Sequence, residues 1–252
     1  MKTVFITGAT SGIGKACAGK FAKEKYNLII TGRRKERLDA LVKELSSENN
    51  IKVLPLCFDV QDRKAVFSAI ENLSPEWQRV DILINNAGLA LGKDAFDEAD
   101  INDWDTMLNS NVHGLLYVTR ALLPILKKSA APHIINIGST AGKEVYENGN
   151  VYCASKFAVD AISKAMRIDL LKHGIKVTAI HPGAAETEFS LVRFKGNQPK
   201  ADAVYQDIKP LSGADIADTI FYCASLPPHV CINDLVITCL HQANSFYMSK
   251  KS

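Results

Sequence analysis

Short runs of apolar residues alternate with longer, helically patterned segments along the whole chain. The short runs are rich in Val, Ile and Leu and alternate little with polar residues. This is typical of strands covered by helices on both faces of a sheet. We predict seven such strands: Thr3–Thr7, Asn27–Thr31, Lys52–Phe58, Asp81–Asn85, His133–Ile137, Lys176–Ile180 and Asp234–Thr238.

The segments between these strands predict six helices, because their apolar residues recur at helical spacing. The expected ranges are Ile13–Lys25, Lys35–Ser47, Asp62–Leu73, Asn102–Leu126, Val151–His173 and Asp215–Ser225. Repeated strand–helix units imply parallel strands joined by right-handed crossovers. The sequence therefore predicts an α/β fold, a Rossmann-type doubly wound parallel sheet. No linker, low-complexity tract or repeat divides the chain, so we expect a single domain over residues 1–252.

One stretch fits neither pattern. The segment Gly183–Pro210 contains Gly196, Pro199 and several charges, and it directly follows a predicted strand. A connection of this length is uncommon in such a fold unless it has a function. We expect a substrate lid here, with an irregular surface excursion as the alternative.

The charge balance and hydropathy exclude several classes of partner. The net charge is +3, and no block of Lys and Arg suggests a groove for nucleic acid. No stretch approaches the roughly 18 apolar residues of a membrane span. The chain opens directly on a strand and a glycine-rich turn, Met1–Gly8, which leaves no room for a signal peptide. We therefore expect neither nucleic acid nor membrane among its partners.

The six cysteines show no C-x-x-C pair and no metal-ligand spacing. Most lie inside apolar runs, where Cys behaves as a small hydrophobic residue. We expect buried, reduced thiols, no metal site and a cytoplasmic location.

A glycine-rich turn, TGATSGIG (7–14), follows the first strand and opens the first helix. Glycine lets the backbone turn tightly and approach a pyrophosphate, and the helix N-terminus offers free N–H groups to it. The spacing is G-x-x-x-G-x-G rather than G-x-G-x-x-G, so the usual fingerprint does not apply literally. A glycine-rich turn without a ligand is the alternative. The candidate cofactor residues in this turn are Gly8, Thr10, Ser11, Gly12, Ile13 and Gly14.

The end of the second strand favours NADP over NAD. An NAD site places a carboxylate near this point for the ribose 2′-hydroxyl, and that carboxylate would repel a 2′-phosphate. Here Gly32 takes the expected acidic position, and Arg33 and Arg34 follow. Guanidinium groups bind phosphate with two charge-assisted hydrogen bonds, although two solvated arginines before a helix are the alternative.

Asp59 and Val60 end the third strand, where they are suited to hold the adenine edge. The alternative is that Asp59 or Asp62 only caps the next helix.

Three residues suggest proton chemistry. Ser139 ends the fifth predicted strand, at the carboxyl edge where open α/β sheets bind ligands. Tyr152 and Lys156 are four positions apart near the start of a helix, so they share one face. A nearby lysine favours a phenolate and lowers the pKa of a tyrosine from about 10. An aromatic core residue beside a lysine with an exposed head group is the alternative.

The motifs occur in a fixed order over nearly the whole chain: TGATSGIG (7–14), NNAG (85–88), Asn111, Ser139, YCASK (152–156) and PG (182–183) followed by Thr187. Together they resemble the motif set of short-chain dehydrogenases/reductases. The resemblance implies that Tyr152 is the general acid/base, that Lys156 lowers its pKa and holds the nicotinamide ribose, and that Ser139 bonds the substrate carbonyl oxygen.

The same resemblance implies roles for the remaining motif residues. Asn111 would position a water in the proton relay from Lys156. Tyr152 and Lys156 would also contact NADP. The other residues expected to flank NADP or seat its nicotinamide are Asn85, Asn86, Ala87, Gly88, Pro182, Gly183 and Thr187.

A closer resemblance concerns the substrate. NNAGLALG (85–92), INIGSTAG (135–142), GNVYCASK (149–156) and TEFSLVRFKGN (187–197) are similar to the 3-hydroxy acid dehydrogenase branch of that family. The resemblance implies an NADP-dependent oxidoreductase acting on serine, allo-threonine, 3-hydroxyisobutyrate or the matching semialdehyde. Arg193 or Lys195 in the lid would supply a cation for the substrate carboxylate, unless it is an exposed or interface-paired cation.

Two rival functions stay open. One is a reductase of a bulkier ketone or acyl-thioester, and the other is a non-catalytic NADP-binding regulator. The regulator predicts erosion of the catalytic set, whereas Asn111, Ser139, Tyr152 and Lys156 are all present.

Two departures from the family pattern remain. His181 precedes Pro182, as either a pH-sensitive group or a structural histidine at a strand end. Cys239–Gln242 replace a glycine-rich ending, a change that we expect to matter more for assembly than for chemistry.

Assembly itself is suggested by an alanine stripe on the helix of Tyr152, formed by Ala154, Ala158, Ala161 and Ala165. Small residues permit close helix approach, and the family resemblance implies a homotetramer, although the helix propensity of alanine explains the stripe equally well.

Overall fold

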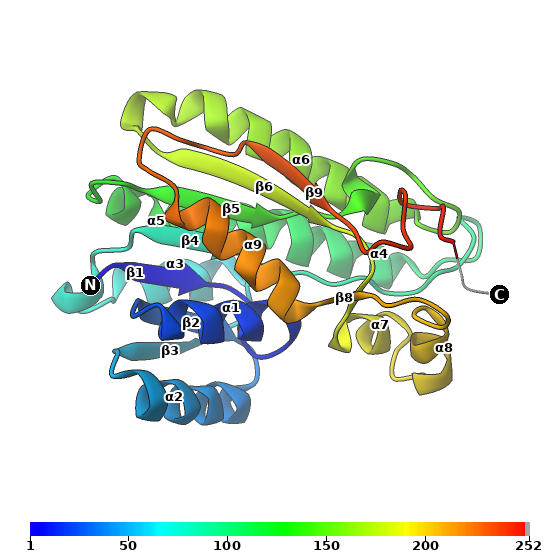
Figure 1. The fold of residues 1–252 in the computed structure, drawn as a ribbon, viewed down its shortest axis with the longest axis horizontal. Helices are drawn as coiled ribbons and strands as arrows, with labels where there is room; N and C mark the ends of the chain where they lie inside the picture. Colours follow the sequence, from blue (N-terminus) through cyan, green and yellow to red (C-terminus); the bar gives the residue numbers. More distant parts are fainter. Residues whose placement is uncertain (250–252) are drawn as a thin grey trace.

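The central element is one parallel sheet, seen in a computed structural model that describes residues 1–249 (Figure 1). Its seven strands lie in the order β3-β2-β1-β4-β5-β6-β9. Their bounds are β1 Thr3–Ile6, β2 Asn27–Gly32, β3 Val53–Cys57, β4 Ile82–Asn85, β5 His133–Ile137, β6 Lys176–Pro182 and β9 Asp234–Ile237. The strand order reverses between β1 and β4, the point at which open α/β sheets bind ligands. The predicted α/β class and doubly wound parallel sheet are confirmed.

Helices cover both faces of this sheet (Figure 1). Val4 and Ile6 of β1 pack on one face with α1 (Gly12–Lys23), α2 (Lys35–Asn49) and α9 (Gly213–Ser225). Phe5 between them packs on the other face with α3 (Arg63–Glu71), α5 (Gly114–Leu126) and the end of α6 (Asn150–Asp169). Successive side chains of a strand point to opposite faces, so an unbroken apolar run is needed to bury both.

The predicted helix Asn102–Leu126 is interrupted, and this is a correction. The segment forms α4 (Ile101–Leu108), a π-helical turn η2 (Asn109–His113) and then α5. The apolar periodicity continues through the turn, which is why the pattern did not reveal it. Asn109, Ser110 and Asn111 are weak helix formers, and π-turns occur often at functional sites. Here the turn carries Asn111, which is 2% exposed.

The stretch Gly183–Pro210 contains regular elements, although its sequence fits neither the strand nor the helix pattern. It contains β7 (Ala185–Glu186), α7 (Glu188–Arg193) and α8 (Gln198–Ala203), and β7 pairs in parallel with β8 (Leu211–Ser212). The two short helices begin at polar caps: Thr187 accepts a hydrogen bond from the Phe189 N–H, and Asn197 accepts one from the Lys200 N–H. These caps satisfy backbone donors that an irregular loop would leave to water.

The cysteines follow the expected pattern only in part. All six are free thiols, and Cys17, Cys153, Cys223 and Cys239 are buried. Cys57 is exposed and Cys231 is half-buried, contrary to the expectation that all are buried. Cys57 ends β3, the edge strand of the sheet, where no further strand covers it. Among residues 1–249, no helix is both long enough and apolar enough to cross a bilayer.

Candidate functional site

A cleft of about 900 Å³ opens at the carboxyl ends of β1, β4 and β5. Most of the predicted site residues line it, on segments far apart in the sequence. They are Gly8, Thr10, Ser11, Gly12, Ile13, Arg33, Arg34, Asp59, Val60, Asn86, Ala87, Gly88, Ser139, Tyr152, Lys156, Pro182, Gly183, Thr187 and Arg193. Gly14, Asn85 and Asn111 do not line it.

The glycine turn lies closely against the loop after β4. Gly8 and Gly12 have φ values of +66° and +53°, which favour glycine. A Cβ on Gly14 would lie 2.3 Å from the Gly8 carbonyl oxygen, so a larger residue at position 14 would collide with the turn. Asn86 donates from Nδ2 to the Thr7 and Gly8 carbonyl oxygens at 2.9 and 3.1 Å. The Ser11 side chain makes no cap hydrogen bond to α1, so the first N–H groups of this helix are available to a phosphate.

Arg34 extends this phosphate cradle toward the second strand. Its Nη2 donates to Thr10 Oγ1 at 3.0 Å and to Ser11 Oγ at 3.1 Å. A Cβ on Gly32 would lie 2.6 Å from the Thr10 methyl group, so a carboxylate-bearing residue at 32 would displace Thr10. Arg33 pairs with Asp59 at 3.3 Å beside it. This end of the cleft therefore suits a phosphate rather than a ribose hydroxyl.

The helix cap expected as the alternative role of Asp59 or Asp62 is made by one of them. Asp62, not Asp59, caps α3 by accepting from the Ala65 N–H at 3.0 Å. Asp59 instead faces the cleft and pairs with Arg33.

An acidic residue of α7, Glu188, reaches the same arginine. Its carboxylate accepts from Arg34 Nη1 at 3.2 Å and from Arg37 Nη1 at 2.8 and 2.9 Å. Burial raises the pKa of Glu188, but the hydrogen bonds from Arg37 and Arg34 outweigh this and hold the pKa below its ordinary value. Arg37 was not predicted, although it follows Arg34 by three residues at the start of α2, a spacing that places both on one face.

The proton-transfer residues lie at the ends of β5 and α6. Tyr152 and Lys156 are both buried, at 7% exposure, whereas Ser139 is half-buried at the cleft wall. The Ser139 hydroxyl accepts from the Ala141 N–H at 3.1 Å. Lys156 Nζ donates to the Ile137 carbonyl oxygen at 2.9 Å. The lysine is thus fixed to the strand end that carries the serine.

Burial opposes the expected lowering of the Tyr152 pKa. It raises the pKa of Tyr152 above its ordinary value, and the Ser139 side chain and the Arg193 charge offset this only in part. Burial also lowers the pKa of Lys156 to about 8. Desolvation disfavours both charged forms, which outweighs the attraction expected from their spacing.

Two predicted asparagines lie behind the cleft rather than in it. Asn85 is buried and donates to Thr119 Oγ1 and Asn136 Oδ1, each at 2.9 Å, and its contact with a cofactor stays a prediction. Asn111 accepts from the Leu89 N–H and donates to the Leu89 carbonyl oxygen, both at 2.8 Å, and it also donates to Ser155 Oγ at 3.0 Å. Its side chain therefore ties the π-turn to the loop after β4.

Arg193 lies at the substrate end of the cleft. Its guanidinium carbon is 5.5 Å from the centre of the Tyr152 ring and 5.6 Å from that of Tyr146. Nη1 donates to the Tyr146 hydroxyl at 3.0 Å, and Nε donates to the Gly92 carbonyl oxygen at 3.1 Å. Lys195, the other candidate, instead pairs with Asp103 at 2.8 Å and does not line the cleft.

Several lining residues were not predicted. Tyr146 precedes α6 by four residues, and Phe189 lies with its ring centre 5.7 Å from that of Tyr152. The C-terminal segment also lines the cleft, through Gln242, Ser245, Phe246 and Met248. Gln242 Oε1 accepts from the Ala184 N–H at 2.7 Å, at the base of the Gly183–Pro210 segment. The departure at Cys239–Gln242, which was expected to matter more for assembly than for chemistry, therefore also shapes the cleft.

Known proteins similar to this chain share its full length. The family model of short chain dehydrogenases matches residues 2–197. Sulfoacetaldehyde reductase 2 of Chromohalobacter salexigens is 46% identical over 245 residues, 97% of this chain and 96% of that protein. NADP-dependent 3-hydroxy acid dehydrogenase of Schizosaccharomyces pombe is 42% identical over 251 residues, 99% of this chain and 97% of that protein.

Among solved structures, the closed form of a serine dehydrogenase complexed with NADP⁺ is similar over the whole chain. It has a TM-score of 0.91 and 41% identity, and the match covers 99% of this chain and all of that one.

Proposed function

This chain belongs to the short-chain dehydrogenase family, and we propose that it is an NADP-dependent oxidoreductase acting on a small 3-hydroxy acid or the matching semialdehyde. The observation that carries the proposal is the position of Arg193, a cation held against the Tyr152 ring inside the cleft. Relatives named for 3-hydroxy acids and for serine support it. The test is steady-state turnover of such acids by the purified protein with NADP and with NAD.

The chain's own residues divide the work of such a reaction. NADP, when bound, supplies or accepts the hydride, which is the chemistry of the cofactor. Tyr152 would give a proton to the substrate oxygen in reduction and take it in oxidation. Ser139, which lines the cleft with Tyr152, would donate to the same oxygen as negative charge develops there. The Lys156 ammonium, fixed by the Ile137 carbonyl oxygen, would favour the proton transfer electrostatically.

The phosphate end of the cleft supports NADP over NAD. Arg33 and Arg34 flank the position left open by Gly32, and the Thr10 and Ser11 hydroxyls orient Arg34. A 2′-phosphate would accept bidentate hydrogen bonds there, whereas NAD offers no charge to these guanidinium groups.

Replacement of Glu188 should strengthen NADP binding. A 2′-phosphate must compete with the Glu188 carboxylate for Arg34, so E188Q removes a competing and repelling charge. We expect the Kd of NADP and of 2′,5′-ADP to fall by about three- to five-fold, in keeping with an exposed ion pair, while the Kd of NAD stays unchanged. Fluorescence titration measures all three. E186Q, an exposed glutamate of β7 outside these ion pairs, is the matched control. Weaker NADP binding by E188Q would instead mean that Glu188 organises the arginines.

A sulfonate is the second candidate head group. One relative at 46% identity is named sulfoacetaldehyde reductase 2. In sulfoacetaldehyde, as in a 3-oxo acid, one carbon separates the carbonyl carbon from the anionic group. A guanidinium recognises either anion through parallel N–H donors, so Arg193 fits both classes. A bulkier ketone or acyl-thioester would gain no binding energy from the Arg193 cation. A non-catalytic regulator would not need this cation.

Loss of the Arg193 charge should raise KM for anionic substrates. A hydrogen bond to a charged group contributes about 1.5–3 kcal/mol, so R193A should raise KM for a 3-oxo acid by about 10- to 100-fold. R193K retains the charge but loses the planar fork of the guanidinium group. Its KM should lie between those of the wild-type protein and R193A. Turnover of a neutral short ketone serves as the internal control and should not fall. An unchanged KM for the acid in R193A would remove Arg193 as the anchor.

The segment Gly183–Pro210 is proposed to act as the substrate lid. It reaches the loop after β4 through Arg193 and Gly92, α4 through Lys195 and Asp103, and the arginines of α2 through Glu188. These contacts cross the mouth of the cleft, so opening the lid requires breaking exposed ion pairs that are individually weak.

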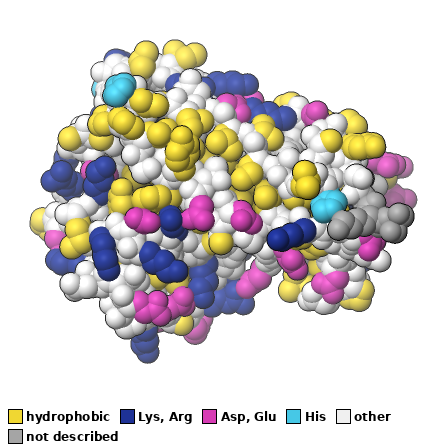
Figure 2. All heavy atoms as spheres, viewed as in Figure 1, with side chains coloured by type: hydrophobic (Ala, Val, Ile, Leu, Met, Phe, Trp, Pro, Cys, Tyr) yellow, Lys and Arg dark blue, Asp and Glu magenta, His cyan; other side chains and the backbone are white. Residues whose placement is uncertain are grey.

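We also propose a homotetramer. On α6, Ala154, Ala161 and Ala165 of the alanine stripe are exposed. Figure 2 shows apolar side chains gathered on the upper part of one face, in the region of α6, β9 and α9. Exposed apolar residues of this region include Ile168, Tyr222 and Val236. Contiguous apolar surface of this kind marks interfaces. A monomeric mass in sedimentation would contradict the tetramer. The six unbridged thiols favour a reducing compartment, which supports a cytoplasmic location.

A further inference from the structure

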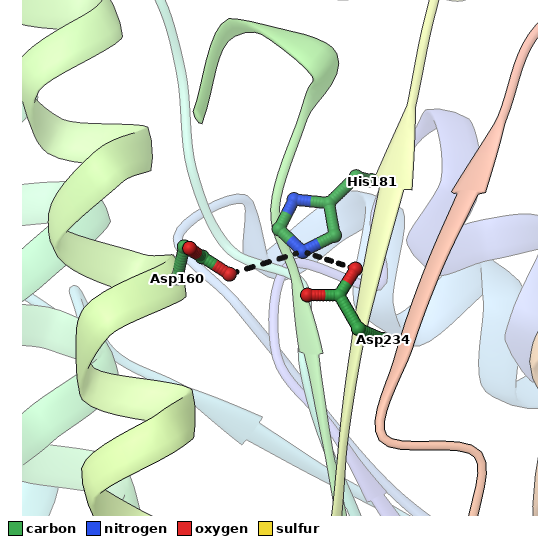
Figure 3. A group of neighbouring side chains, drawn as sticks. All are labelled: Asp160, His181 and Asp234. Atoms are coloured by element: carbon green, nitrogen blue, oxygen red, sulfur yellow. Dashed lines mark ion pairs between the residues drawn. The ribbon is translucent and has the colours of Figure 1, made fainter. Parts of the chain in front are cut away.

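A group of charged side chains surrounds His181 (Figure 3). His181, on β6, is fully buried. Its Nε2 lies 3.6 Å from Asp160 Oδ1 of α6 and 3.6 Å from Asp234 Oδ1 of β9. Lys143, which follows the short 3₁₀ turn η3 (Thr140–Gly142), pairs with both carboxylates, at 2.8 Å from Asp160 Oδ1. Lys164 of α6 pairs with Asp160 Oδ2 at 2.7 Å.

Asp160, His181 and Asp234 resemble a set of metal ligands, but the neighbouring charges do not favour a metal. The ammonium groups of Lys143 and Lys164 already neutralise the two carboxylates. A divalent cation would add two uncompensated charges beside the buried His181 and Asp160, which is costly. The cluster therefore does not favour a metal.

The other ring nitrogen contacts the serine. His181 Nδ1 lies 3.2 Å from the Ser139 carbonyl oxygen. A carbonyl oxygen only accepts, so Nδ1 must carry the proton. Nε2 has no hydrogen-bond partner among the described residues. Gly138 makes room for this contact, because a Cβ there would lie 2.4 Å from Nδ1.

Among residues 1–249, the Ser139 carbonyl oxygen is otherwise held only within its own turn. It accepts from the Gly142 N–H at 2.9 Å, a contact within its own turn. His181 adds a donor from β6, the neighbouring strand, just as Lys156 Nζ from α6 holds the Ile137 carbonyl oxygen. Both side chains thus fix the strand end from which the Ser139 hydroxyl reaches the cleft.

We propose that His181 is a positioning residue for the reaction, holding Ser139 in place through its Nδ1–H. The inference rests on the proposed function, because it assumes that Ser139 acts on the substrate. Errors of about 1 Å in such a group cost about 100-fold in rate, so a second anchor on its main chain has a large effect.

Two amide variants separate this role from a merely structural one. In H181N the amide nitrogen takes the place of Nδ1 and retains a donor for Ser139. In H181Q the amide reaches the place of Nε2 and leaves the Ser139 carbonyl oxygen without that donor. We expect H181N to keep kcat near the wild-type value and H181Q to lose about 10- to 100-fold in kcat, with the Kd of NADP unchanged in both. Equal kcat in the two variants, whether both high or both low, would overturn the proposal.

Proton uptake gives a second readout. Burial and the Lys143 ammonium hold the pKa of His181 below its ordinary 6.5, against the pull of Asp234 and Asp160. The unfolded chain therefore binds this proton first as the pH falls below about 6.5, and the wild-type protein loses stability there. H181N lacks this titration, so its free energy of unfolding should fall less between pH 7 and 5. An equal fall in both proteins would show that His181 does not stay neutral in the fold.

The tautomer can be read without any substrate. Six histidines give ring ¹⁵N signals in labelled protein, and the signal absent from H181N belongs to His181. We expect its proton on Nδ1 at neutral pH; a proton on Nε2 alone would overturn the proposal even in an active enzyme. Wild-type inactivity toward every small acid would contradict the proposed function instead, and this spectrum would still decide the contact with Ser139.

Discussion

Replacing Tyr152 with phenylalanine should lower kcat/KM by about 1,000-fold, because general acid–base catalysis contributes between about 100- and 10,000-fold. Tyr152 is 7% exposed, and phenylalanine lacks only its hydroxyl oxygen, so the ring stays packed on Phe189. Stopped-flow measurement of NADPH consumption gives the rate. The Kd of NADP and the unfolding midpoint should match those of the wild-type protein.

The matched control is Tyr146→Phe, which removes a neighbouring cleft hydroxyl that bonds only Arg193 among the described residues. It should raise KM modestly and leave the proton chemistry intact. A comparable loss of kcat in Tyr146→Phe would assign the acid role to the wrong tyrosine.

The pH dependence of the reaction rate follows from the burial of Tyr152. Since the pKa of Tyr152 is raised, the hydroxyl is protonated at neutral pH and ready to donate in reduction. Oxidation needs the phenolate, whose fraction grows about tenfold per pH unit below the pKa. Oxidation should therefore accelerate as the pH rises from 7 to 9, whereas reduction should not.

Lys156→Met should abolish turnover and stabilise the fold. Burial lowers the pKa of Lys156 from 10.5 to about 8, so the folded protein carries a buried ammonium at neutral pH. At about 1.4 kcal/mol per pKa unit this costs about 3 kcal/mol. Methionine fills the same space without the charge but leaves the Ile137 carbonyl oxygen without its donor, at a cost of about 1 kcal/mol. The variant should thus gain about 2 kcal/mol in free energy of unfolding.

The direction in which stability changes with pH tests whether burial of the Lys156 charge is the cause of this gain. The folded pKa lies below the unfolded value, so between pH 8 and 10.5 the unfolded chain binds more protons and wild-type stability rises with pH. Lys156→Met should lack this rise. Lys164→Met, on the same helix but exposed, should change stability little. A destabilised Lys156→Met variant would contradict the idea that burial of the charge is costly.

The sheet was predictable because its signal is local. All seven strands contain short apolar runs, and only their ends differ: β6 continues to Pro182 because it pairs there with Ile237 of β9. The family predicted from the motifs is confirmed by the match over residues 2–197. The π-turn at Asn109–His113 could not be predicted from periodicity, since the apolar pattern runs through it unbroken.

The site was predictable where motifs share one strand edge and not where it depends on contacts between distant segments. The positions of Arg34 and Tyr152 followed from strand ends and helical spacing. The partner of Arg34 did not, because Glu188 lies 154 residues away. The tail contact of Gln242 with Ala184 also depends on tertiary packing. The raised pKa of Tyr152 follows from burial, which spacing does not report.

Direct assay of cofactor and substrate together tests the central claim. Purified protein is given L-serine, L-allo-threonine and 3-hydroxyisobutyrate with NADP and with NAD, and malonic semialdehyde and sulfoacetaldehyde with NADPH and with NADH. We predict turnover of small acids with the phosphorylated cofactor alone, lost in Tyr152→Phe. Turnover of a bulky neutral ketone but of none of these anions, with NADP still bound, would contradict the account.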